Sequence, residues 1–119
     1  MAKFLRKGNI MKLSTAWNGF HFHMEARDLS PHTVADYRNT IHKFIKYTND
    51  RPVDQITKSD IQSFLQSLNG LSKKTKLNYH TGLAAFWTWL IDEGLSTDHI
   101  VRAVKPPKPA DPDIGQWVI

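Results

Sequence analysis

The sequence contains no cysteine, which excludes disulfides and thiolate metal sites and favours a reducing, cytoplasmic setting. No apolar run approaches the roughly 18 residues of a membrane span, and the N-terminal stretch lacks the apolar core of a signal peptide. The alternation of apolar and polar residues that marks a strand is also missing. With 119 residues, 40% of them hydrophobic, the chain is expected to form one soluble domain with its own core.

Motifs of enzymatic chemistry are equally scarce. There is no glycine-rich phosphate loop, no nucleophile elbow and no His-Glu-x-x-His. His21 and His23 are two residues apart, a spacing that points their rings to different faces of a helix and disfavours a metal site. His99 and Arg102 spell His-x-x-Arg, a short match that arises easily by chance. We therefore expect no catalytic residues, no metal and no nucleotide cofactor.

Acidic residues are absent from the first twelve positions, and this absence accounts for most of the net charge of +5. The remainder of the chain is nearly balanced, with 12 basic and 11 acidic residues. Within it, Lys73, Lys74 and Lys76 lie in a stretch without an acid from residue 61 to residue 91. Global charge alone leaves nucleic-acid binding open, so the placement of the lysines has to decide it.

Helical periodicity predicts four helices and a short fifth. The first spans residues 13 to about 27, with an apolar stripe of Leu13, Trp17, Phe20 and Met24. Ser30 is a favourable N-cap followed by Pro31, so the second helix runs from there to about Asn49. Its apolar face comprises Val34, Tyr37, Ile41, Phe44, Ile45 and Thr48.

Further helix starts follow along the chain. Thr57 with Asp60 resembles a capping box, and this helix is expected to stop at Asn69–Gly70. Ser72 caps a fourth helix of about twenty residues, whose apolar arc is broad enough to pack against two or more neighbours. Thr97 is expected to start the short fifth helix, which carries Ile100, Val101 and Val104 and ends before Pro106.

One segment recurs 42 residues later. The pattern Leu29-Ser30-x-x-Thr33-x-x-x-Tyr37 returns as Leu71-Ser72-x-x-Thr75-x-x-x-Tyr79, and the pairs Ile41/Leu83 and Phe44/Phe86 continue it. Either similar helix starts converge on similar caps, or the second and fourth helices play related roles. In both cases the helix starts present free N–H groups, which attract phosphate.

Two polar helix faces are the candidate binding surfaces. The face on the second helix is basic, with Asp36 near its edge, and ordinary solvation explains it equally well. The face on the fourth helix is small and uncharged beyond its first turn, with Ala85 and Thr88 toward its end, and it permits close approach to a polyanion. Trp89, at its margin, is a candidate packing site for a partner. The predicted binding residues are Asn39, His42, Lys43, Lys46, Ser72, Lys73, Lys74, Thr75, Lys76, Asn78 and Thr81.

Over about residues 13–109 the chain resembles the tyrosine recombinases, the phage integrase and Xer-like group. The resemblance rests on the order and spacing of several short motifs rather than on any single one. They are Leu29-Ser30-Pro31-His32-Thr33 with Tyr37, Ile41 and Phe44; Ile56-Thr57-x-x-Asp60-Ile61; Ser72-x-x-Thr75 leading into Leu83, Phe86, Trp87 and Leu90; Asp92-Glu93-Gly94-Leu95; and Val104-Lys105-Pro106-Pro107-Lys108-Pro109.

The resemblance implies an all-α fold, a SAM-like orthogonal bundle of four to five helices. Residues 13–104 would be the core-binding domain, preceded by a basic tail at 1–12 and followed by a proline-rich linker at 105–119. In this family a catalytic domain after the linker carries the Arg, His-x-x-Arg and Tyr of strand cleavage. The chain would then be a fragment and no enzyme on its own, and His99–Arg102 would not be the catalytic pair.

The partners implied by the resemblance are double-stranded DNA and other recombinase protomers in a synaptic assembly of the full-length protein, with no membrane and no cofactor. Two alternatives remain. A SAM-type protein–protein interaction module would have the same helical architecture without DNA binding. A free-standing DNA-binding regulator would require the chain to end naturally at Ile119.

Overall fold

The computed structural model describes residues 11–68 and 70–106. This part of the chain contains four α-helices: α1 (Leu13–Ala26), α2 (Pro31–Thr48), α3 (Lys58–Gln66) and α4 (Lys73–Asp92). A short 3-10 helix, η2 (Val53–Gln55), connects α2 and α3. Because the sole β-type pairing within the described residues is one isolated bridge between Lys12 and Pro52, the prediction of an all-α fold is confirmed.

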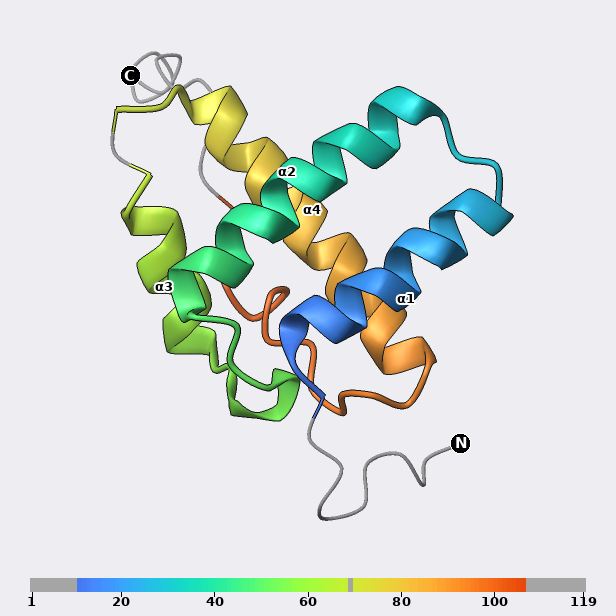
Figure 1. Ribbon diagram of the computed structural model, residues 1–119. Helices are drawn as coiled ribbons and strands as arrows, with labels where there is room; N and C mark the ends of the chain where they lie inside the picture. Colours follow the sequence, from blue (N-terminus) through green and yellow to red (C-terminus); the bar gives the residue numbers. More distant parts are fainter. Residues whose placement is uncertain (1–10, 69, 107–119) are drawn as a thin grey trace.

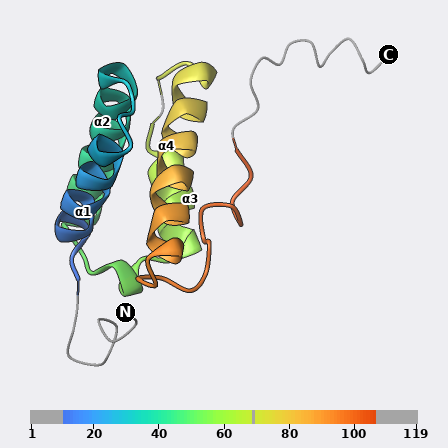
Figure 2. The same cartoon turned by 90° about the vertical axis from the view of Figure 1, so that its right-hand side faces the viewer.

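The helices form two antiparallel pairs that lie in two layers, α1 with α2 and α3 with α4 (Figures 1 and 2). α2 crosses over α4, which also contacts α1 and α3. These three neighbours explain why the apolar arc of α4 is so broad. None of the helices in residues 11–68 and 70–106 is both long and apolar enough to cross a membrane.

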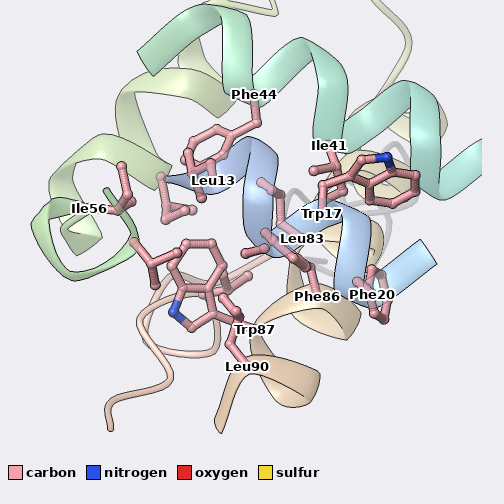
Figure 3. Close-up of a cluster of buried hydrophobic side chains, with 14 of the residues drawn as sticks. Leu13, Trp17, Phe20, Ile41, Phe44, Ile56, Leu83, Phe86, Trp87 and Leu90 are labelled. Atoms are coloured by element: carbon pink, nitrogen blue, oxygen red, sulfur yellow. The ribbon is translucent and has the colours of Figure 1, made fainter. Parts of the chain in front are cut away.

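The core fills the space between the layers and is rich in aromatic side chains (Figure 3). Phe44, Phe86 and Trp87 are fully buried, and Phe44 meets Phe64 edge to face with ring centroids 5.0 Å apart. Burial on this scale contributes most of the favourable free energy of folding. The apolar stripe predicted for the first helix is buried in full: Leu13, Trp17, Phe20 and Met24.

The three predicted N-caps are all present. The Ser30 hydroxyl accepts a hydrogen bond from the Thr33 N–H at 3.1 Å, and Ser72 accepts from the Thr75 N–H at the same distance. Thr57 forms a complete capping box. Each cap satisfies a backbone donor that the helix itself leaves unpaired, so these residues fix where α2, α3 and α4 begin.

The predicted end of the third helix was too late. α3 stops at Gln66, where the Ser67 hydroxyl donates to the Phe64 carbonyl at 2.6 Å and competes with the backbone ladder. Gly70, with φ of +92°, supplies the left-handed turn between α3 and α4. Asn69, the other residue of the predicted stop, lies outside the described residues.

The predicted fifth helix is wrong: the segment from Thr97 to Val104 forms turns. Its backbone donors find other partners, since the Arg102 N–H donates to His99 Nδ1 at 3.1 Å. His80 donates from Nε2 to the Val104 carbonyl at 2.9 Å, which holds the segment against α4. Val101 and Val104 are therefore buried, as the apolar pattern predicted, although they do not lie in a helix.

The ends of the expected domain are described only in part. The Met11 carbonyl accepts from the Val53 N–H at 2.8 Å, and the Leu13 N–H donates to the Arg51 carbonyl. Met11 and Lys12 are thereby attached to the helical body. The rest of the expected basic tail, residues 1–10, and residues 107–119 of the expected proline-rich linker lie outside the described residues.

Asp60 connects the start of α3 to the loop before η2. Its carboxylate accepts hydrogen bonds from the Thr57 N–H at 2.8 Å and from the Arg51 guanidinium at 2.7 Å. Partial burial acts to raise the pKa of Asp60, but the hydrogen bonds from Thr57 and Arg51 outweigh it and hold the pKa below its ordinary value. This carboxylate therefore stabilises the fold while it is ionised.

We expect Asp60→Asn to lower the free energy of unfolding at pH 7 by about 1–2 kcal/mol, as for the loss of a helix cap. Because the folded pKa is lowered, the contribution is present above the unfolded value of about 3.9 and is lost as the pH falls through the folded pKa. Urea unfolding at pH 7 and pH 3 should therefore show a smaller difference from wild type at pH 3. Asp54→Asn, at an exposed position in η2, is the control. Equal losses at both pH values would contradict this account.

His99 connects α4 to the turns that follow it. Because its Nδ1 accepts from the Arg102 N–H, the neutral ring carries its proton on Nε2, which lies 3.0 Å from the Thr88 hydroxyl. Burial, aided by the positive charge of Arg102, lowers the pKa of His99. Protonation would also remove the acceptor on Nδ1.

We expect His99→Ala to be less stable than wild type at pH 7.5, with a smaller gap at pH 5.5. A lowered folded pKa means that the wild type loses stability as the pH falls below the unfolded value of about 6.5, and the variant lacks this loss. Thermal melts of both proteins at the two pH values measure the gap. A gap that is constant, or wider at pH 5.5, would show that His99 is not the titrating group.

Candidate nucleic-acid interface

A polar groove separates the N-terminal halves of α2 and α4, which diverge from the point where the two helices cross (Figure 1). At the crossing Gly82 is buried, and a Cβ atom there would lie 3.1 Å from Thr40 Cγ2. A Cβ atom there would require the Thr40 side chain to shift by a few tenths of an ångström, so glycine suits this close approach. The groove has a volume of about 360 Å³ and is lined by Thr33, Asp36, Tyr37, Asn39, Thr40, Thr75, Asn78, Tyr79 and Thr81.

The two walls of the groove correspond through the 42-residue repeat. Four lining residues of α2 have a lining counterpart on α4, and Thr40 meets its own counterpart, Gly82, at the crossing. The other pairs are Thr33/Thr75, Asp36/Asn78, Tyr37/Tyr79 and Asn39/Thr81. The structure thus favours the interpretation that the second and fourth helices play related roles over mere convergence of their caps.

The tyrosines of this repeat also occupy matching places. Tyr37 stacks on Phe20 of α1, with ring centroids 6.1 Å apart. Tyr79 packs on Phe64 of α3, with centroids 6.2 Å apart. Each groove wall is therefore held against the preceding helix by the same kind of contact, which leaves the polar lining residues on rigid elements.

The predicted binding residues fall into several groups. Asn39, Thr75, Asn78 and Thr81 line the groove, and all but Thr75 are exposed. The exposed side chains of Ser72, Lys73 and Lys74 begin α4 at one end of the groove. Lys43 and Lys46 are exposed farther along α2. The structure thus gathers the neutral residues in the groove and leaves these lysines around it.

Two predicted residues lie apart from the groove. His42 is exposed on α2, but its ring meets Trp17 of α1 edge to face, with centroids 5.4 Å apart. Lys76 lines a separate hollow of about 620 Å³ between α3, α4 and the segment that follows α4. Lys58 and Lys105 line the same hollow.

The small face of α4 is open over its first half only. Ala85 packs against the hydrophobic core, and Thr88 is bonded to His99. Trp89, considered as a contact for a partner, packs inside the domain: its ring lies 5.6 Å from that of Phe20 and covers Gly19. The exposed surface available for a ligand therefore ends near Thr81.

Sequence reasoning missed part of the groove lining. The 42-residue repeat contains three of the missed residues, Thr33, Tyr37 and Tyr79. Their matching positions in the repeat could have placed them on matching walls of the groove. Asp36 was seen only at the edge of the basic face of α2. In the structure it lines the groove and pairs with His32 at 3.4 Å, with both side chains largely exposed.

His99 and Arg102 lie in the turns that follow α4. The His99 ring is bonded to Thr88 and to the backbone of its own turn, while the Arg102 side chain is exposed. The imidazole therefore has a structural role in holding the segment after α4.

Comparison with solved structures finds the same fold in integrases. A lambda integrase dimer bound to a COC' core site matches with a TM-score of 0.77 and 18% identity, over 86% of this chain and 29% of the other. A lambda integrase tetramer bound to a Holliday junction matches with a TM-score of 0.78 and 19% identity, over 87% of this chain and 30% of the other. The integrase from mycobacterium phage Brujita matches with a TM-score of 0.71 and 23% identity, over 79% of this chain and 32% of the other.

Sequence comparison agrees with the structural likeness. Tyrosine recombinase XerC of Alcanivorax borkumensis is 33% identical over 94 residues, which cover 76% of this chain and 31% of that protein. The chain thus matches about a third of the length of this relative. The model of the family described as phage integrase, N-terminal SAM-like domain, matches residues 17–97. Because this match covers more than half of the chain and the four-helix fold agrees with it, the chain belongs to the family of N-terminal SAM-like domains of phage integrases.

Proposed function

We propose that this chain is the DNA-binding, core-binding domain of a site-specific tyrosine recombinase, and that it clamps target DNA for strand exchange performed by a catalytic domain of the full-length protein. The observation that carries the proposal is the groove between α2 and α4, whose lining is neutral apart from Asp36, with Lys73 and Lys74 at the start of α4 and Lys43 and Lys46 exposed farther along α2. Lysines on the two helices that form a mostly neutral groove suit phosphates flanking the base edges of a duplex.

The related proteins support this proposal. The lambda integrase structures of the same fold are a dimer on a core site and a tetramer on a Holliday junction. By analogy, the partners of this domain would be double-stranded DNA and other protomers of the same recombinase. The proposed role needs no cofactor, because the domain contributes binding while the chemistry belongs to the catalytic domain.

A SAM-type protein–protein interaction module is the second candidate, and one observation favours it. Phe22 on α1 is 73% exposed, and a protein partner that covered it would bury its aromatic ring. This candidate predicts weak binding to DNA that does not depend on the groove. The two experiments below separate it from the proposal.

The first experiment measures how binding depends on salt. Each phosphate neutralised by a lysine adds about 0.9 to the slope of log affinity against log salt concentration. If Lys73 and Lys74 both contact phosphate, changing both to Ala should flatten that slope by about two units. Fluorescence anisotropy titrations of a duplex at several salt concentrations give the slope, and a thermal melt checks the fold. An unchanged slope would place the DNA elsewhere.

The second experiment places a carboxylate in the groove. Thr81→Glu should weaken duplex binding by about 1–3 kcal/mol, because it brings further negative charge close to a polyanion. Thr81 is exposed and Glu has a good helix propensity, so the fold should tolerate the change. Thr81 serves better than Ala85, whose contact with the core would confuse binding with stability. Ser63→Glu, at an exposed site on α3, adds the same charge away from the groove. Equal effects of the two variants, measured by anisotropy, would show that the wrong face was chosen.

A further inference from the structure

Asp36 is the one charged residue among those that line the groove between α2 and α4. The other eight lining residues are neutral threonines, asparagines and tyrosines. A surface built only to hold phosphate would exclude a carboxylate, because like charges repel across the contact. The position of Asp36 therefore calls for a ligand group that donates hydrogen bonds.

The carboxylate is available for such a ligand. Its side chain is 59% exposed, and its one ion pair or hydrogen bond within residues 11–68 and 70–106 is the pair of Oδ2 with His32 Nε2 at 3.4 Å. The second oxygen, Oδ1, has no partner in the described part of the chain, although an ionised carboxylate accepts several hydrogen bonds. Asp36 thus presents an acceptor to whatever occupies the groove.

The counterpart of Asp36 in the 42-residue repeat is Asn78, on the opposite wall. The two side chains have nearly the same shape but different hydrogen-bonding capacity, since the carboxylate only accepts and the amide both donates and accepts. In the major groove cytosine offers the N4 amino donor, whereas adenine offers the N6 donor beside the N7 acceptor. The N7 acceptor would repel a carboxylate and suits an amide, which binds adenine in a bidentate manner.

We propose that Asp36 is a specificity-determining residue that accepts a hydrogen bond from the N4 amino group of a cytosine in the DNA duplex. The proposal rests on the proposed function, because it assumes that the groove faces base edges. Lys43 lies seven residues farther along α2, about 10 Å from Asp36 by the rise of a helix, so phosphate and base contacts can be made by one helix. Lysines outside the groove would hold the backbone while the single acid within it reads a base.

The experiment selects duplexes from a pool of random sequences with the 119-residue chain and sequences those retained. Wild type should enrich cytosine at one position, and Asp36→Asn should lose that preference by about tenfold and favour adenine there, with other positions unchanged. Asp92→Asn, at an exposed site at the far end of α4, removes the same charge outside the groove and should leave the base preferences as in wild type. Thermal melts of all three proteins check the fold.

Two results would overturn the inference while leaving DNA binding intact. One is the same base profile for Asp36→Asn as for wild type. The other is uniformly tighter binding of Asp36→Asn to all sequences, which would mean that the carboxylate merely opposes phosphate. Failure of the proposed function itself looks different: wild type would retain no duplex from the pool, or Thr81→Glu would bind as wild type does, and the inference would fall with it.

Discussion

The crossing of α2 and α4 at Thr40 and Gly82 is the constraint on which the rest of the structure depends. A Cβ atom at residue 82 would come within 3.1 Å of the Thr40 side chain, which is tighter than most Cβ contacts, so the two helices approach each other closely here. This contact joins the two layers of the fold. Beyond the crossing the N-terminal halves of α2 and α4 diverge (Figure 1), and the residues that line the groove come from these halves.

The crossing explains why the repeat in the sequence has structural meaning. Residues 40 and 82 are separated by the same 42 positions as the caps Ser30 and Ser72 and as the tyrosines that pack on the preceding helices. Corresponding residues meet at the crossing, so corresponding faces must look into the same groove. The walls carry the same side chain at Thr33/Thr75 and Tyr37/Tyr79, so a difference such as Asp36 against Asn78 distinguishes one wall from the other and bears on the proposed ligand.

Local signals were enough to predict most of the fold, since Ser30, Thr57 and Ser72 cap helices through contacts within one turn. The prediction of the fifth helix was wrong because the Arg102 N–H binds the His99 side chain and the Val104 carbonyl binds the distant His80, contacts that apolar periodicity does not reveal. For the site, helical spacing identified the polar faces but could not tell that Lys76 points to another hollow or that Ala85 is covered. Those facts depend on how α4 packs against three neighbours.

α4 couples the groove to the segment that follows it. Thr75, Asn78 and Thr81 line the groove on one side of the helix, while His80 and Thr88 hold the turns from His99 to Val104 on another. Because a helix of twenty residues is stiff, the groove and the place where the chain leaves the bundle near Lys105 have a fixed relation. The proposed role, in which the domain orients DNA for chemistry performed by another domain, would require such a relation, since small misplacements of reacting groups are costly. On that proposal, His80 and His99 would contribute to positioning through the segment after α4, although neither lines the groove.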